Sequence, residues 1–217
     1  MSLQEIRTLM PERIEEESMR IIEEEMDKER IGFYTKEELK VVKRCIHTSA
    51  DFDYQYNLVF TKNAVFQGME ALKKGARIVT DTTMAAAGIN KEKLAKLNVL
   101  LSCFIADEDV KEEARARRIT RSACCMEKTA LLAAEEERPL MIAIGNAPTA
   151  LIRLDELIKE GRIKPALIIA APVGFVNVKE SKELIMQSPL PHIAARGRKG
   201  GSNIAACIVN AMLYQIA

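Results

Sequence analysis

The stretch PLMIAIGNAPTALIRLDELIKEGRIKPALIIAAPVG, residues 139–174, indicates the fold class of the chain. Its two ends, PLMIAIG (139–145) and PALIIAAPVG (165–174), are short apolar runs that predict buried strands. The segment between them, APTALIRLDELIKEG, has the apolar spacing of a helix. A strand, a helix and a second strand in this order are typical of a parallel sheet covered by helices.

The same alternation extends along the chain in both directions. Further strands are predicted at ARIVTD (76–81) and NVLLSCF (98–104), and a weaker one at PHIAA (191–195). Helical patterns lie between the strands, in residues 108–137 and 178–187. This alternation predicts an α/β fold with three layers, α/β/α, and a mostly parallel sheet of about five strands.

The N-terminal part of the chain predicts helices that precede the sheet. PERIEEESMRIIEEEMDKE (11–29) has an apolar helical stripe, and Ser18 lies on it. Thr35 and Glu38 have the spacing of a capping box at the start of a second helix. We therefore expect a single domain over residues 1–217 with an N-terminal helical extension.

The composition limits the class of function. The chain has 32 basic and 31 acidic residues, a balance that argues against a nucleic-acid partner. No run approaches the roughly 20 apolar residues that cross a bilayer, and the start of the chain lacks the apolar segment of a signal peptide. We therefore expect a cytoplasmic protein without a membrane partner.

The cysteines and histidines argue against a metal site. The five cysteines show no C-x-x-C spacing, so we expect reduced and mostly buried thiols. The chain has only two histidines, which excludes a multi-histidine metal site within one chain. We interpret the second histidine, His192, as structural, because it follows Pro191 at the start of a predicted strand.

Polar loops follow four of the predicted strands. In an open parallel sheet, ligands bind beyond the carboxyl ends of the strands, so these loops are expected to form one broad polar rim. The loops are DTTMAAAGI (81–89), GNAPTAL (145–151), APVGFVNVKESKE (171–183) and RGRKGGSN (196–203).

The last of these loops combines glycines with three basic residues in front of a helix, which suits a carboxylate or a phosphate. It is not a P-loop, because Lys199 precedes Gly200, Gly201 and Ser202, and the GxGxxG fingerprint is absent after the first strand. A tight turn without a ligand is the alternative interpretation.

His47 is the candidate for proton chemistry. Arg44 precedes it by one helical turn, and Asp51 and Asp53 follow it. A histidine whose tautomer is fixed by a carboxylate can act as an acid or a base near neutral pH. A packed or surface histidine is the alternative.

A further basic segment, RITRSACC, starts at residue 118. Thr120, Arg121 and Ser122 are expected to begin a helix there, and a solvated basic face is the alternative. Taken together, the residues predict an α/β enzyme with one histidine for proton chemistry and a ligand with several anionic groups.

Six motifs, taken in order, resemble those of the precorrin-8X methylmutase family of cobalamin biosynthesis. They are HTSADFDY, TDTTMAAAGI, TRSACCM, IGNAPTAL, PVGFVNVKESKE and GRKGGSN. The resemblance extends from PERIEEESM to the C-terminal helix. The chain departs from the family at Cys124 and Cys125, where alanines are usual, and this bears on helix packing only.

The resemblance implies an isomerase that moves a methyl group from C-11 to C-12 of a corrinoid ring by a [1,5]-sigmatropic shift. The product would be hydrogenobyrinate or its cobalt counterpart, cobyrinate. The resemblance also implies that no cofactor is used, that any cobalt belongs to the substrate, and that the enzyme is a homodimer with sites near the interface. In this family His47 would protonate a ring nitrogen and so trigger the shift.

The resemblance also implies residues that bind the corrinoid substrate. Arg44 lies in the R-x-x-H motif and Ser18 in the E-x-S-[MF] motif, which correspond to substrate-contacting positions. The other expected substrate-binding residues are Arg121, Ser122, Asn146, Gly197, Arg198, Lys199 and Gly200. An apolar loop surface for the flat ring is expected from Met84, Pro172, Val173 and Phe175.

Two other functions stay open from the residues alone. The chain could be an α/β transferase or hydrolase that binds a phosphorylated metabolite at the same basic loop. It could also be a corrinoid carrier that binds the ring without turnover.

Overall fold

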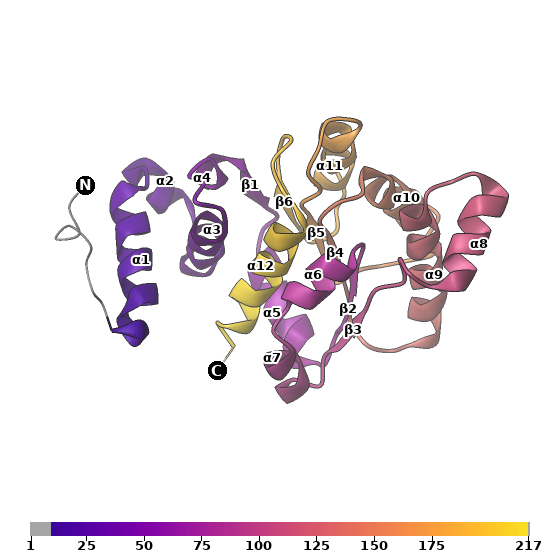
Figure 1. Cartoon of the computed structure of the whole chain (residues 1–217), viewed down its shortest axis with the longest axis horizontal. Coiled ribbons are helices and arrows are strands. Elements are labelled where there is room, and N and C mark those ends of the chain that lie inside the picture. The colour runs from indigo at the N-terminus through magenta and orange to yellow at the C-terminus, as the bar shows by residue number, and fades with distance from the viewer. Residues whose placement is uncertain (1–9, 217) are drawn as a thin grey trace.

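The computed structural model describes residues 10–216 and contains one mixed sheet of six strands (Figure 1). The strands lie in the order β1-β6-β5-β4-β2-β3, and every neighbouring pair is parallel except β1 and β6. Their bounds are β1 Leu58–Phe60, β2 Arg77–Thr80, β3 Leu100–Ser102, β4 Leu140–Ile144, β5 Leu167–Ala170 and β6 His192–Ala195.

The helices of residues 10–216 precede the sheet, connect its strands and, with α12, follow the last strand. Their bounds are α1 Pro11–Glu25, α2 Lys28–Phe33, α3 Lys36–Ser49, α4 Tyr54–Asn57, α5 Ala64–Lys73, α6 Thr83–Gly88, α7 Lys91–Lys96, α8 Glu108–Arg117, α9 Arg121–Glu135, α10 Pro148–Lys159, α11 Val178–Met186 and α12 Ser202–Leu213. None of them is both long enough and apolar enough to cross a membrane.

Helices cover both faces of the sheet, as the alternation of the sequence predicts. Successive side chains of a strand point to opposite faces. In β4, Met141 and Ala143 join a hydrophobic core with α3, α5 and α12, whereas Ile142 and Ile144 join a second core with α8, α9, α10 and α11. The three-layer arrangement is therefore confirmed, and both cores share the central strands.

Strand β1 is not among the predicted strands, so the sheet has six strands where about five were expected. It is three residues long and pairs antiparallel with β6, at the edge of the sheet. Its three residues, LVF, are apolar, but so short a run is not distinctive, and only Leu58 of the three is buried.

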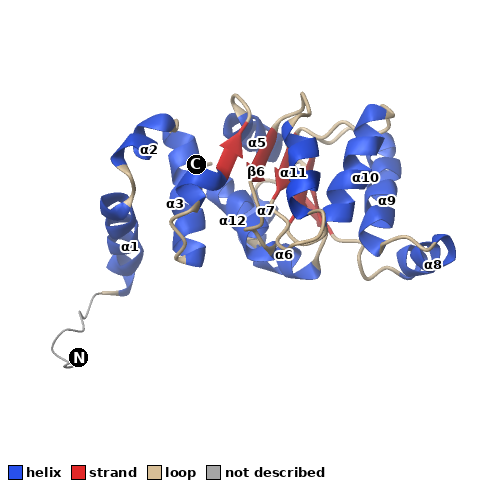
Figure 2. Ribbon diagram, turned by 90° about the horizontal axis from the view of Figure 1, so that it is seen from above, coloured by secondary structure: helices blue, strands red, loops and turns tan. Residues whose placement is uncertain are grey.

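The N-terminal helices lie at one end of the molecule and α8 lies at the other, in both views (Figures 1 and 2). The single helix expected over 11–29 is interrupted: α1 ends at Glu25, and the side chain of Asp27 accepts from the amide of Glu29 at 2.9 Å to start α2. Thr35 and Glu38 form the predicted capping box of α3. Ile22 and Met26 of α1 are buried, but Ile14 and Ile21 are exposed.

Candidate functional site

Four loops meet at the carboxyl ends of β2, β4, β5 and β6, which are neighbours in the sheet. Asp81, which follows β2, is almost fully buried. Its carboxylate accepts hydrogen bonds from the amides of Gly145, Asn146 and Ala147 at 2.9, 2.8 and 2.8 Å. Burial raises the pKa of Asp81, and the three amide donors act in the opposite direction. Asp81 therefore fixes the loop that follows β4, including Asn146.

Two glycines let these loops approach one another backbone to backbone. A Cβ atom at Gly145 would lie 2.5 Å from the Cα of Ser202, and one at Gly200 would lie 2.2 Å from the carbonyl oxygen of Ala171. The amide of Gly201 donates to the same Ala171 oxygen at 2.8 Å. The loops after β4 and β5 are thus packed directly against the segment that leads into α12.

The segment of residues 196–201, named the basic loop here, is held from two sides. The ammonium group of Lys182, on α11, donates to the carbonyl oxygens of Gly197 and Lys199 at 2.9 and 2.8 Å. The amide of Gly174 donates to the carbonyl of Arg198 at 3.2 Å. Lys182 was not identified from the sequence, because a lysine within VKESKE has the pattern of a solvated helix face.

The basic loop also contacts the segment that follows His47. The Nζ atom of Lys199 lies 2.6 Å from a carboxylate oxygen of Asp51 and 2.6 Å from one of Asp53. Hydrogen bonding with these carboxylates raises the pKa of Lys199, and the same contact lowers the pKa of Asp51. The two carboxylates expected to orient the His47 ring pair with Lys199 instead, and within residues 10–216 neither forms a hydrogen bond with His47.

Helix α3 carries His47 to the same edge of the sheet. The hydroxyl of Thr48 donates to the sulfur of Cys207 at 3.1 Å, and the guanidinium of Arg44 lies 5.1 Å from the ring centroid of Tyr214. These two contacts show that α3 runs antiparallel to α12, so the C-terminal end of α3 lies near the start of α12 and the basic loop. His47 is exposed there, without a hydrogen-bond or ion-pair partner in residues 10–216.

Arg44 and Ser18 lie on the helical extension rather than at the four loops. Arg44 forms an ion pair with Glu15 of α1 and lines a pocket of about 270 Å³ between α1, α3 and α12. The hydroxyl of Ser18 donates to the carbonyl of Ile14 at 2.8 Å, one turn earlier on α1. Glu15 and Ser18 are three residues apart, so Ser18 is on the part of α1 that faces Arg44.

Arg121 and Ser122 lie at the start of α9, which Thr120 caps as expected. The hydroxyl of Thr120 donates to that of Thr149, in the first turn of α10, at 2.8 Å. Arg121 is exposed, and its guanidinium donates to the carbonyl of Ile105 at 3.4 Å, whereas Ser122 is nearly buried. Arg121 therefore flanks the loop that carries Asn146, on the side away from His47.

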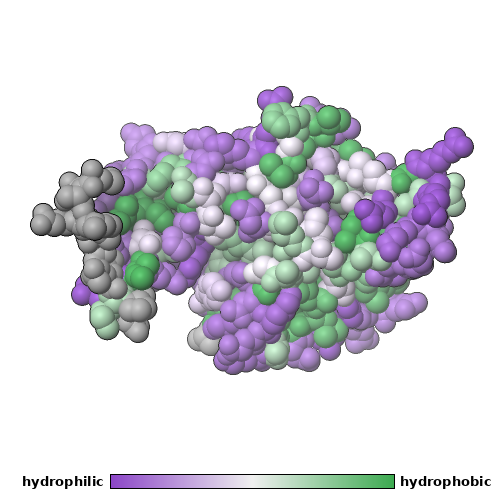
Figure 3. All heavy atoms as spheres, in the orientation of Figure 1, coloured by the Kyte–Doolittle hydropathy of each residue, from purple (hydrophilic) through white to green (hydrophobic). Residues whose placement is uncertain are grey.

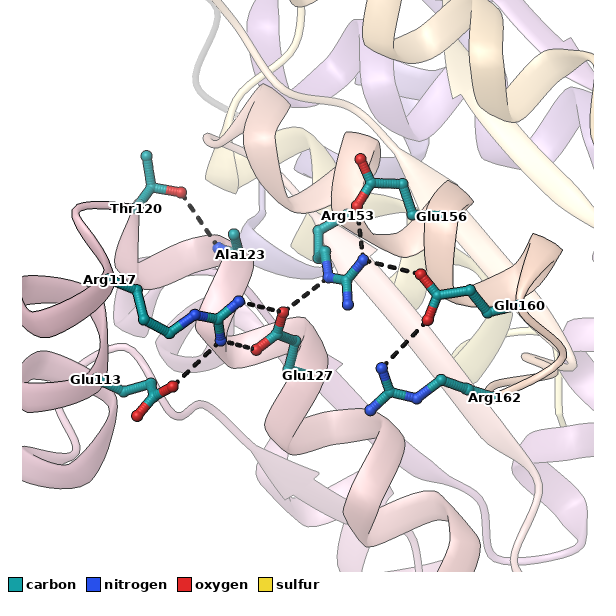
Figure 4. Close-up of polar contacts among 9 residues, drawn as sticks. All are labelled: Glu113, Arg117, Thr120, Ala123, Glu127, Arg153, Glu156, Glu160 and Arg162. Carbon is teal, nitrogen blue, oxygen red and sulfur yellow. Dashed lines mark hydrogen bonds and ion pairs between the residues drawn. The ribbon is translucent and has the colours of Figure 1, made fainter.

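A pocket of about 460 Å³ near Thr120 does not suit an anionic ligand. Its arginines, Arg117 and Arg153, both pair with Glu127, which lies between them (Figure 4). Arg153 also pairs with Glu156 and Glu160, and Arg117 with Glu113. The network joins α8, α9 and α10 and leaves no arginine of this pocket without a carboxylate.

Apolar side chains next to the basic loop are exposed. Phe175 and Val176 are 84% and 79% exposed in the loop before α11, where Figure 3 shows hydrophobic side chains at the top of the molecule. The guanidinium of Arg198 lies 5.7 Å from the Phe175 ring centroid. Met84 and Val173 are exposed as expected, but Pro172 is buried, because the loops after β5 and β6 pack together there.

The cysteines and His192 are buried for the most part, as predicted. All five cysteines are free thiols, and all except Cys103 are buried, including Cys124 and Cys125 within α9. His192 is buried in β6, and its Nδ1 atom lies 3.0 Å from the carbonyl oxygen of Leu190. Residues 10–216 hold no cluster of histidine, cysteine and carboxylate side chains suited to a metal ion.

Comparison with known proteins identifies the family of the chain. A family model described as precorrin-8X methylmutase matches residues 13–215. The cobalt-precorrin-8 methylmutase of Leptospira interrogans is 43% identical over 206 residues, covering 92% of this chain and 91% of the relative. That of Salmonella typhimurium is 45% identical over 176 residues, covering 81% and 80%.

A solved structure gives the same result at the level of the fold. The precorrin-8X methylmutase of Thermus thermophilus superposes with a TM-score of 0.81 at 36% identity, covering 94% of this chain and 95% of that one. The part of this chain that the family model matches, residues 13–215, contains every strand and helix that positions the loops described above. The chain belongs to the precorrin-8X methylmutase family.

Proposed function

We propose that this protein moves a methyl group from C-11 to C-12 of cobalt-precorrin-8 or its metal-free counterpart, giving cobyrinate or hydrogenobyrinate. Its family membership supports the reaction class. The names of the relatives from Leptospira and Salmonella favour the cobalt-loaded ring. We further propose that the protein itself uses no cofactor and that any cobalt arrives within the substrate ring.

The observation that carries the proposal is the exposed imidazole of His47 beside the anchored basic loop. In its imidazolium form, His47 donates a proton to a ring nitrogen near the migrating methyl group. The bond from the methyl group to C-11 then breaks as the bond to C-12 forms, and the proton returns to the imidazole. Substrate and product are isomers, so no second reactant is needed.

The arrangement around His47 suits a flat ring with carboxylate arms. We propose that Arg198 and the amides of residues 197–200 bind carboxylates, and that Arg121 and Asn146 provide donors further along the same edge. Lys199 can serve the same purpose only by leaving Asp51 and Asp53, because both carboxylates hold it in this structure. The exposed Phe175 and Val176 supply apolar surface for the ring.

We also propose a homodimer with each site near the interface. The support is the exposed apolar side chains of Ile14 and Ile21 on α1, 52% and 39% exposed, and of Met10 just before the helix, 67% exposed. An exposed apolar helix face of this kind is typical of an interaction surface. Sedimentation of the purified protein tests this: the proposal predicts a dimer for the wild type and a shift toward monomer for the Ile14→Glu, Ile21→Glu double variant.

We place the reaction in the cytoplasm, because the five free cysteines suit a reducing compartment. The enzyme is distinguished from a carrier by turnover. Purified protein is mixed in parallel with cobalt-precorrin-8 and with metal-free precorrin-8X, and the absorbance spectrum is followed. The proposal predicts conversion to the isomer, faster with the cobalt-loaded ring. Colour that stays bound after desalting without spectral conversion would indicate a carrier instead.

A further inference from the structure

Lys182 is the one buried lysine among the residues that the structure describes. It lies on α11, beneath the basic loop, and is fully screened from solvent. No carboxylate of residues 10–216 forms an ion pair with it, and its described hydrogen-bond partners are the carbonyl oxygens of Gly197 and Lys199. Its positive charge is therefore balanced by two backbone dipoles instead of an acidic side chain.

Burying a lysine in this way carries a free-energy cost. Desolvation lowers the pKa of Lys182 to about 8, so removal from water disfavours the charged form. A methionine has a similar length and would fill the same space without that cost. Packing alone therefore does not require an ammonium group at this position. Its contribution lies in its contacts with the basic loop.

The two carbonyl contacts determine how the basic loop is presented. Because the carbonyls of Gly197 and Lys199 point inward to Lys182, the backbone between them is fixed from below. The side chain of Arg198 lies over Phe175, and that of Lys199 reaches Asp51 and Asp53. The buried charge also adds positive potential beneath a loop that is expected to receive an anion.

We propose that Lys182 is a positioning residue that holds the basic loop in the conformation that binds the carboxylates of the substrate. This inference rests on the proposed function for the identity of the ligand, but its structural part concerns the loop alone. A loop ordered before the ligand arrives loses less conformational entropy on binding. Lys182 therefore acts on substrate affinity, and the proton transfer at His47 stays unaffected.

Two variants and one control test the role of Lys182. Lys182→Met removes the ammonium group and keeps its length, whereas Lys182→Gln keeps a neutral donor for one carbonyl. Lys179→Met is the matched control, because Lys179 is exposed on the same helix. The expected result for Lys182→Met is a KM raised about tenfold or more with kcat within about twofold, since the lost interaction affects binding alone. Lys182→Gln is expected to restore part of the affinity.

Hydrogen exchange gives a readout that does not depend on the substrate. In Lys182→Met, amides of residues 196–201 should exchange faster than in the wild type, with the rest of the sheet unchanged. Unchanged exchange in this loop would overturn the proposal, as would a wild-type KM or a fall in kcat alone. If Lys182→Met does not fold, the same measurements on Lys182→Gln decide. A wild type that fails to isomerise the ring would refute the proposed function, while loop exchange still decides the role of Lys182.

Discussion

Replacing Asp81 by alanine tests how the carboxyl edge of the sheet is built. The change leaves the amides of Gly145, Asn146 and Ala147 without their acceptor. Each buried amide left unpaired costs roughly 1–3 kcal/mol. Relief from burying a carboxylate offsets part of this loss. We therefore expect the free energy of unfolding to fall by about 3–5 kcal/mol.

Urea unfolding and thermal melting measure this loss. For a chain of this length, the expected fall in Tm is about 6–20 °C, at about 2–4 °C for each kcal/mol. Asp81→Asn should give an intermediate loss, because its single oxygen can accept from Asn146 and Ala147 while its amide group faces the Gly145 donor. The control is Asp109→Asn, an exposed carboxylate paired with Lys128, which should leave the urea midpoint unchanged.

The result that would refute this reasoning is a wild-type urea midpoint for Asp81→Ala. Water or another acceptor would then satisfy the three amides, and Asp81 would not anchor the loop that carries Asn146. A loss confined to activity, with stability intact, would also contradict the account, because two of the three amides that Asp81 accepts from, those of Gly145 and Ala147, are buried.

Three further predictions concern packing, pH and thiol reactivity. Gly200→Ala should lower the free energy of unfolding, measured in urea, by about 1–3 kcal/mol, because its Cβ would meet the Ala171 oxygen at 2.2 Å. Gly32 has open space around it, so the control Gly32→Ala should not lower the free energy of unfolding. Burial lowers the pKa of His192, so the unfolded state takes up its proton first as pH falls. Stability should therefore drop below about pH 6.5, and less steeply in His192→Asn; an equal slope would contradict this. Burial raises the pKa of Cys125 to about 12, so native protein at pH 8 should be alkylated at the partly exposed Cys103 before Cys125, as mass spectrometry can check.

Local patterns in the sequence predicted much of the fold. The central strands are apolar on both faces, and they were identified because helices bury both sides of them. Thr35 and Thr120 were identified as helix starts because capping depends on residues only three positions apart. Strand β1 lacked such a signal, since its pairing with β6 joins segments far apart in the chain.

The candidate site was predictable in its parts but not in its connections. Motifs indicated His47 and the basic loop, but the contact of Lys199 with Asp51 and Asp53 joins residues almost 150 positions apart and has no local pattern. Lys182 was missed for a related reason. Its neighbours in sequence are polar, and only the way α11 packs beneath the basic loop buries it.

Single-turnover isomerisation by His47→Ala tests the central claim most directly. Cobalt-precorrin-8 is mixed in separate reactions with a molar excess of the wild type, of His47→Ala and of the control His192→Asn. Conversion is followed by absorbance. The account predicts that His47→Ala retains the coloured ring after desalting but isomerises it about 100-fold more slowly or worse, while His192→Asn converts it like the wild type. Conversion by His47→Ala at the wild-type rate would contradict the account.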